Sequence, residues 1–128
     1  MPLLKNALTR LVIDGDKLVL VPQVLVELWV VATRPLEANG FGWDANRVSS
    51  VIGILRTQFE LLDEIPSAFE LWLKLVRENN ILGKRAHDAR LAAMAIAHGV
   101  FHILTLNTDD FVGLPEITPL HPLSVISV

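Results

Sequence analysis

The chain of 128 residues predicts a mixed α/β fold with a mostly parallel sheet. Helix-like and strand-like segments alternate along it, without an internal repeat or a low-complexity stretch. An alanine-rich apolar run at residues 89–97 leads into a short apolar strand at 101–105. Polar residues follow that strand, at the edge of a parallel sheet where ligands bind. The length predicts a single domain over residues 1–128.

The first three helices each carry a local signal. Residues 3–13 have apolar side chains at helical spacing. Pro22 suits the first turn of a strongly apolar helix at residues 23–33. Asp44 is placed to accept a hydrogen bond as the N-cap of a helix at residues 45–58.

Two further helices follow. Residues 66–79 again show apolar side chains at helical spacing. Residues 89–97 predict a buried helix, with Asp88 at its start. Gly99 ends this helix, because glycine adopts a left-handed cap without steric cost.

Short runs rich in β-branched and other apolar residues predict the strands. They lie at residues 17–21, 59–62, 101–105 and 116–118. Pro119, His121 and Pro122 follow the last of these and suit a segment that runs along the surface rather than a core strand.

Composition excludes several classes of protein. Hydrophobic residues make up 52% of the chain, charged residues 20%, and the mean hydropathy is +0.46, so the chain is not disordered. No apolar run reaches the roughly 18 residues of a membrane span, and the start does not resemble a secretory signal, so we expect a cytoplasmic protein without a membrane partner. The absence of cysteine excludes disulfides, thiolate zinc sites and cysteine nucleophiles. A net charge of −3 argues against broad electrostatic binding of nucleic acid but permits a basic rim around an acidic pocket.

Glu27 interrupts the most apolar helix of the chain. A carboxylate buried there needs a cation, a hydrogen-bond network or a solvent-filled cleft, since burial without a partner costs several kcal/mol. A simpler interpretation places Glu27 at the helix edge, paired with Arg34 or another base.

A second group of polar residues surrounds the predicted strand at 101–105. Asp88 at a helix start is often a cap, and Asn107, Asp109 and Asp110 are residue types common in turns. Their convergence near strand ends favours a site for Mg²⁺ or Mn²⁺, which prefer carboxylates and water. A histidine zinc pair is disfavoured, because Gly99 separates the only histidines at helical spacing. Basic residues near these acids could hold phosphates or simply aid solubility.

Three segments resemble the motifs of the PIN-domain ribonucleases, in particular the VapC-like toxins of prokaryotic toxin–antitoxin pairs. Residues 21–35 look like the segment with that family's helical glutamate, residues 87–91 like its central aspartate, and residues 105–111 like its last acidic motif. The motifs occur in the family's order, and the likeness covers nearly the whole chain.

The resemblance implies a PIN-like three-layer fold and a Mg²⁺-dependent or Mn²⁺-dependent endoribonuclease. It makes Glu27, Asp88 and Asp110 the catalytic metal ligands, with Asn107 as a supporting or alternative ligand and Asp109 as the less favoured member of its pair. The implied contacts to RNA come from three basic residues: Arg34, Lys84 and Arg85. The implied partners are the RNA substrate, a cognate antitoxin and a second copy of the chain.

One departure from the family is clear. Family members begin with a buried strand that ends in a ligating aspartate and lies at the centre of the sheet, whereas this sequence starts inside the following helix. We therefore expect an N-terminally truncated chain in which the central strand and one acidic ligand are missing. The alternative function is a catalytically dead PIN-like module that forms a dimer or an antitoxin complex, and a weaker one is a metal-dependent DNA nuclease of the flap type.

Overall fold

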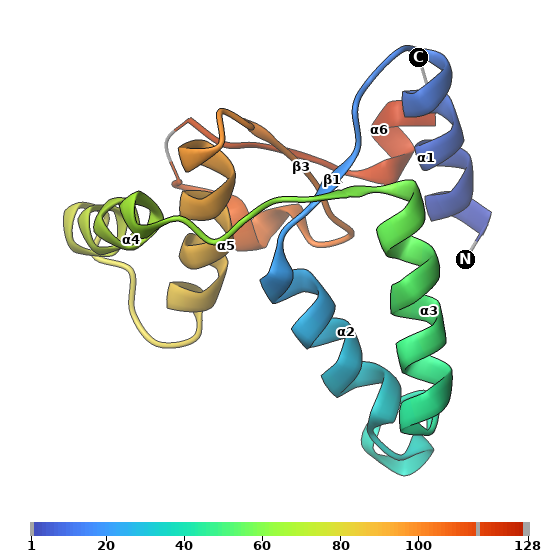
Figure 1. Ribbon diagram of the computed structural model, residues 1–128. Helices are drawn as coiled ribbons and strands as arrows, with labels where there is room; N and C mark the ends of the chain where they lie inside the picture. The colour runs from blue at the N-terminus through green and yellow to red at the C-terminus, as the bar shows by residue number, and fades with distance from the viewer. Residues whose placement is uncertain (1, 115, 127–128) are drawn as a thin grey trace. The chain divides into compact units, whose positions relative to one another are not determined.

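The computed structural model describes residues 2–114 and 116–126 (Figure 1). The chain forms two compact units, one from residues 1–17 and 64–128 and the other from residues 18–63. Both units combine helices with short parallel strands, which confirms the predicted mixed α/β class. No helix in the described ranges has the length and apolar character needed to cross a membrane.

The smaller unit is a pair of helices between two short strands. Its elements are β1 (Val19–Leu20), α2 (Pro22–Thr33), the 3₁₀ helix η1 (Leu36–Ala38), α3 (Ala45–Gln58) and β2 (Glu60–Leu61). Strands β1 and β2 pair in parallel, with Val19 opposite Glu60 and Leu20 opposite Leu61. Parallel strands need a long crossover, and α2 and α3 supply it.

Local signals set the helix starts in this unit as the sequence predicts. Pro22 is the first residue of α2. An N–H at this position makes no hydrogen bond within the helix, so proline, which lacks the N–H, costs nothing here. The Asp44 carboxylate accepts a hydrogen bond of 2.9 Å from the Arg47 backbone N–H and so caps α3. Helices α2 and α3 pack together, and Ala32 and Val48, one from each helix, are fully buried.

The larger unit holds the remaining elements. They are α1 (Pro2–Ile13), α4 (Pro66–Glu78), α5 (Arg85–Ala97), β3 (His102–Leu104), the 3₁₀ helix η2 (Thr108–Phe111), β4 (Thr118–Leu120) and α6 (Pro122–Ile126). Helices α4 and α5 pack closely, and α1 and α6 lie side by side (Figure 1). Trp72 on α4 donates a hydrogen bond of 2.9 Å from Nε1 to the Ala86 carbonyl in the first turn of α5.

Helix α5 is the centre of this unit. Its small side chains let neighbouring elements approach closely, and Ala89 and the run at residues 92–95 are buried. Gly99 has φ +74°, and the Val100 N–H bonds the Ala95 carbonyl while the Gly99 N–H bonds that of Ile96. This pair of bonds is a Schellman cap, so the glycine stop predicted from the sequence is confirmed.

The buried core of the larger unit joins α5 to the segments that follow it. Its members are Ile81, Ala89, Ala92, Ala95, Phe111, Leu114 and Ile117. Phe111 belongs to η2, and its ring fixes this short turn against α5. The core therefore holds together the two elements that carry Asp88 and Asp110.

The last strand differs from its predicted position. Strand β4 begins at Thr118 rather than at residue 116, includes Pro119, and pairs in parallel with β3. The Thr118 N–H bonds the Phe101 carbonyl at 2.7 Å, and the Leu120 carbonyl accepts from the Thr105 N–H at 2.9 Å. The backbone groups that bond β3 thus belong to Thr118 and Leu120, the residues on either side of Pro119. Pro119 lacks an N–H, but its nitrogen points away from β3, so the pairing loses no hydrogen bond.

A short helix follows β4, where the sequence analysis expected an irregular surface segment. Pro122 starts α6, and His121 caps it by accepting a bond of 3.1 Å at Nδ1 from the Leu123 N–H. Pro122 was the sequence signal for this helix, because proline is common at the first helical position. His121 gave no such signal, because histidine is not among the preferred capping residues.

Candidate functional site

Asp88 lies in the first turn of α5. The helix begins at Arg85, three residues before the predicted capping position, and Lys84 stands at the N-cap without a side-chain cap bond. Asp88 is partly buried and directly precedes Ala89, which is fully buried in the core. Its backbone is therefore held against the core, near the helix end that favours negative charge.

Asp110 and Asn107 lie just beyond the end of β3, as predicted. Asn107 Nδ2 donates a hydrogen bond of 3.0 Å to Asp110 Oδ1. The Asn107 backbone N–H in turn donates to Thr105 Oγ1 at 3.1 Å, which anchors the start of the turn. Asp110 is partly buried, whereas Asp109 is exposed, so the two neighbouring aspartates have different environments.

Two contacts bring η2 and α5 together. Phe111, the residue after Asp110, packs into the core that contains Ala89, the residue after Asp88. Arg85 Nη2 donates a hydrogen bond of 2.8 Å to the Val112 carbonyl, which joins the first residue of α5 to the residue that follows η2. Helix α5 and η2, which carry Asp88 and Asp110, are thus joined by the apolar packing of Phe111 and by the hydrogen bond from Arg85.

Glu27 belongs to α2 in the other unit. It is exposed, and its Oε1 accepts a hydrogen bond of 3.2 Å from Gln23 Nε2, one helical turn earlier. Its neighbours Val26 and Val30 are also exposed, at 63% and 51%, so only one side of this apolar helix, with Leu25 and Ala32, is buried. No ion pair joins Glu27 to Arg34 in the described part of the chain.

The donor atoms of the larger unit suit a hard cation. Among the described residues, no group of three or more histidine or acidic side chains is placed to hold a metal ion. Asp88 and Asp110 supply two carboxylates from contacting elements, and Mg²⁺ is commonly bound by one or two carboxylates with water and substrate phosphates in the remaining positions. The chemistry of these donors therefore fits Mg²⁺ or Mn²⁺.

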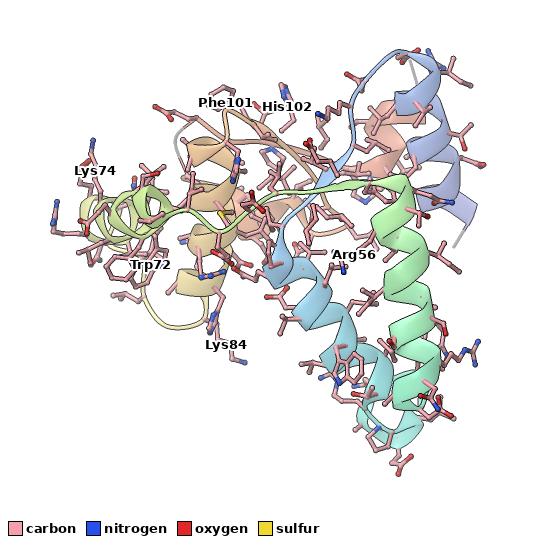
Figure 2. The ribbon with its side chains drawn as sticks, in the orientation of Figure 1. Arg56, Trp72, Lys74, Lys84, Phe101 and His102 are labelled. Atoms are coloured by element: carbon pink, nitrogen blue, oxygen red, sulfur yellow. The ribbon has the colours of Figure 1, made fainter. Side chains whose placement is uncertain are left out.

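The three basic residues predicted to contact RNA are exposed. Arg34 follows the last residue of α2, and Lys84 and Arg85 stand at the start of α5. Figure 2 labels Lys84. Arg85 also donates a hydrogen bond to the Val112 carbonyl, a contact that no pattern in the sequence marks. A guanidinium has five N–H donors, so this bond and a phosphate contact are compatible.

A cavity between α4 and α5 was not predicted. It has a volume of about 260 Å³ and an apolar lining that includes Phe69, Trp72 and Met94. An ion pair of 3.0 Å between Arg90 and Glu64 lies at its edge, so Arg90 is engaged within the fold. The signal in the sequence was the pair of aromatic residues Phe69 and Trp72 at helical spacing on α4.

Comparison with known proteins finds similarity among the solved structures. No family model and no curated protein matches the sequence. A chain in the crystal structure of VapBC2 from Rickettsia felis bound to a DNA fragment from their promoter is similar, with a TM-score of 0.70 and 20% sequence identity. The match covers 91% of this chain and 83% of that one. Similarity at this level of identity shows a shared fold, which confirms the predicted PIN-like fold class.

Proposed function

We propose that this chain is a PIN-domain endoribonuclease of the VapC type, the toxin of a toxin–antitoxin pair, which uses Mg²⁺ or Mn²⁺. The observation that carries the proposal is the joining of α5 and η2, which places two carboxylate-bearing turns in contact. The similar fold of a VapBC2 chain and the three resembling motifs support it.

In the proposed site, Asp88 and Asp110 hold the metal ion from α5 and η2. Glu27 is a further ligand only through the resemblance to the PIN-domain ribonucleases. Asn107 supports Asp110 through its amide, or binds the metal in its place. The metal ion, when bound, supplies Lewis acidity and lowers the pKa of a water molecule that attacks a phosphodiester. Exposed Arg34, Lys84 and Arg85 hold the backbone of the RNA through its phosphates.

The proposed partners follow from the same reasoning. The similar structure contains VapBC2 bound to DNA, which supports an antitoxin as the protein partner of this chain. Exposed large apolar side chains, such as Phe69 at 59% and Leu82 at 71%, provide surface for an antitoxin or for a second copy. We place the protein in the cytoplasm, where both RNA and an antitoxin would be available.

A catalytically dead interaction module is the second candidate. The observation in its favour is the same set of exposed apolar side chains, since partner binding needs no catalysis. Cleavage of RNA by the present chain separates the two candidates.

The test is cleavage of single-stranded RNA in Mg²⁺ or Mn²⁺ by the wild-type chain and two aspartate variants. The proposal predicts cleavage by the wild type and by Asp109→Asn, and its loss in Asp88→Asn. Asp109 is a matched control because it is exposed and directly precedes Asp110. A wild-type chain that binds an antitoxin but cleaves no RNA would favour the interaction module. A preference for branched DNA over RNA would instead favour a flap-type nuclease.

A further inference from the structure

The Arg85 guanidinium links two segments that are distant in the sequence. Arg85 is the first residue of α5, and the Val112 carbonyl that accepts its bond of 2.8 Å lies 27 residues later. Asp110 precedes Val112 by two residues, and Asp88 lies one helical turn after Arg85. The bond therefore joins the helix that carries Asp88 to the residue that follows the turn of Asp110.

The segment held by this bond has weak hydrogen bonds of its own. Three backbone N–H groups, those of Asp110, Val112 and Leu114, donate to carbonyls three residues earlier, each at 3.3 Å. These are long for N–H···O bonds, and a single 3₁₀ turn has little cooperativity. Gly113, with φ +84°, gives the chain additional freedom directly after Val112. A bond of 2.8 Å from a charged donor is stronger than any of these.

We propose that Arg85 is a positioning residue, which holds the Asp110 turn against α5 so that Asp110 and Asp88 can bind one metal ion. The inference rests on the proposed metal site and assigns Arg85 a role beyond the RNA contact that the resemblance implies. Phe111 fixes the apolar side of the turn, and Arg85 fixes its polar side.

The sign of the effect on metal affinity distinguishes positioning from charge. A cation near two carboxylates repels Mn²⁺, so removal of its charge alone should tighten metal binding. Removal of a positioning bond should instead weaken metal binding, by roughly tenfold, as for other groups that orient ligands. If Arg85 only contacted RNA, its removal would not weaken Mn²⁺ binding in the absence of RNA.

The experiment measures Mn²⁺ affinity without RNA by calorimetry for the wild type, Arg85→Met, Arg85→Lys and Lys74→Met. Lys74 is an exposed cation on α4 and serves as the charge-matched control (Figure 2). We expect about tenfold weaker binding in Arg85→Met, partial recovery in Arg85→Lys through one donor to the same carbonyl, and unchanged binding in Lys74→Met. Binding by Arg85→Met as tight as wild type or tighter would overturn the inference.

Hydrogen exchange gives a readout that does not depend on the metal. In the folded Arg85→Met variant, the amides of Asp110, Val112 and Leu114 should exchange roughly tenfold faster, while the amides of α4 should not change. If the wild type binds no Mn²⁺, the proposed metal site fails, and faster exchange still shows that Arg85 holds the turn. Unchanged exchange at these three amides would overturn the positioning role in either case.

Discussion

Asn107 Nδ2 donates a hydrogen bond of 3.0 Å to Asp110 Oδ1 across a single turn. This bond restricts the rotation of the Asp110 carboxylate, which would otherwise turn freely at its end. It also requires the Asn107 amide to face Asp110, so the two proposed ligands are oriented as a pair. Groups that orient a metal ligand in this way typically change the metal affinity by 10-fold to 100-fold when they are removed.

The first prediction concerns this pair. Asn107→Ala should weaken Mn²⁺ binding by roughly tenfold and change the free energy of unfolding by less than about 1 kcal/mol, because Asn107 is exposed. Calorimetry and urea denaturation measure the two quantities. Asn46→Ala, at an exposed position on α3, is the control and should alter neither. Equal Mn²⁺ affinity in Asn107→Ala and wild type would remove Asn107 from the site.

Phe111 is predicted to be the main apolar anchor of η2. It is 6% exposed within the core, so Phe111→Ala should lower the free energy of unfolding by about 3–5 kcal/mol. Phe101 is 45% exposed, and Phe101→Ala should cost less than about 1 kcal/mol. Chemical denaturation compares the two variants. A similar loss at both positions would show that η2 is not held by the core.

The ion pair between Arg90 and Glu64 should contribute little to stability. Both side chains are about half exposed, at 47% and 50%, so solvent screens their attraction. A double-mutant cycle with Arg90→Gln and Glu64→Gln should give a coupling energy below about 1 kcal/mol that decreases in high salt. A coupling of several kcal/mol, insensitive to salt, would contradict this expectation.

Asp44 should stabilise α3 as its N-cap. Its carboxylate satisfies the Arg47 backbone N–H, so Asp44→Ala should cost about 0.5–2 kcal/mol in the free energy of unfolding. Asp44→Ser should restore most of this loss, since serine also caps helices well. Asp16→Ala, at an exposed position outside the helices, is the control. No difference between Asp44→Ala and Asp16→Ala in thermal or chemical unfolding would disprove the cap.

Local signals explain why the helices could be predicted from the sequence. Pro22, Asp44 and Gly99 each act through their own backbone or a neighbour within a few residues, so one sequence is enough to interpret them. The first and last residues of β4 were harder to predict, because its register depends on pairing with β3, which is distant in the sequence.

Long-range contacts explain what the sequence could not show. Arg85 and Val112 are 27 residues apart, and Arg90 and Glu64 are 26 apart, with no pattern in either segment that marks the other. The expected burial of Glu27 failed for another reason. Its apolar neighbours suggested burial, yet Val26 and Val30 are themselves exposed, and apolar residues on a protein surface are common.

Asp110, on the turn that Phe111 holds against α5, is the proposed metal ligand on which the function most depends. Calorimetric titration of Mn²⁺ into the wild type, Asp110→Asn and Asp109→Asn tests it most directly, since the two variants remove the same charge from adjacent residues. We predict that Asp109→Asn binds Mn²⁺ like the wild type and that Asp110→Asn loses at least tenfold in affinity. Equal affinity in the two variants, or a larger loss in Asp109→Asn, would contradict the claim.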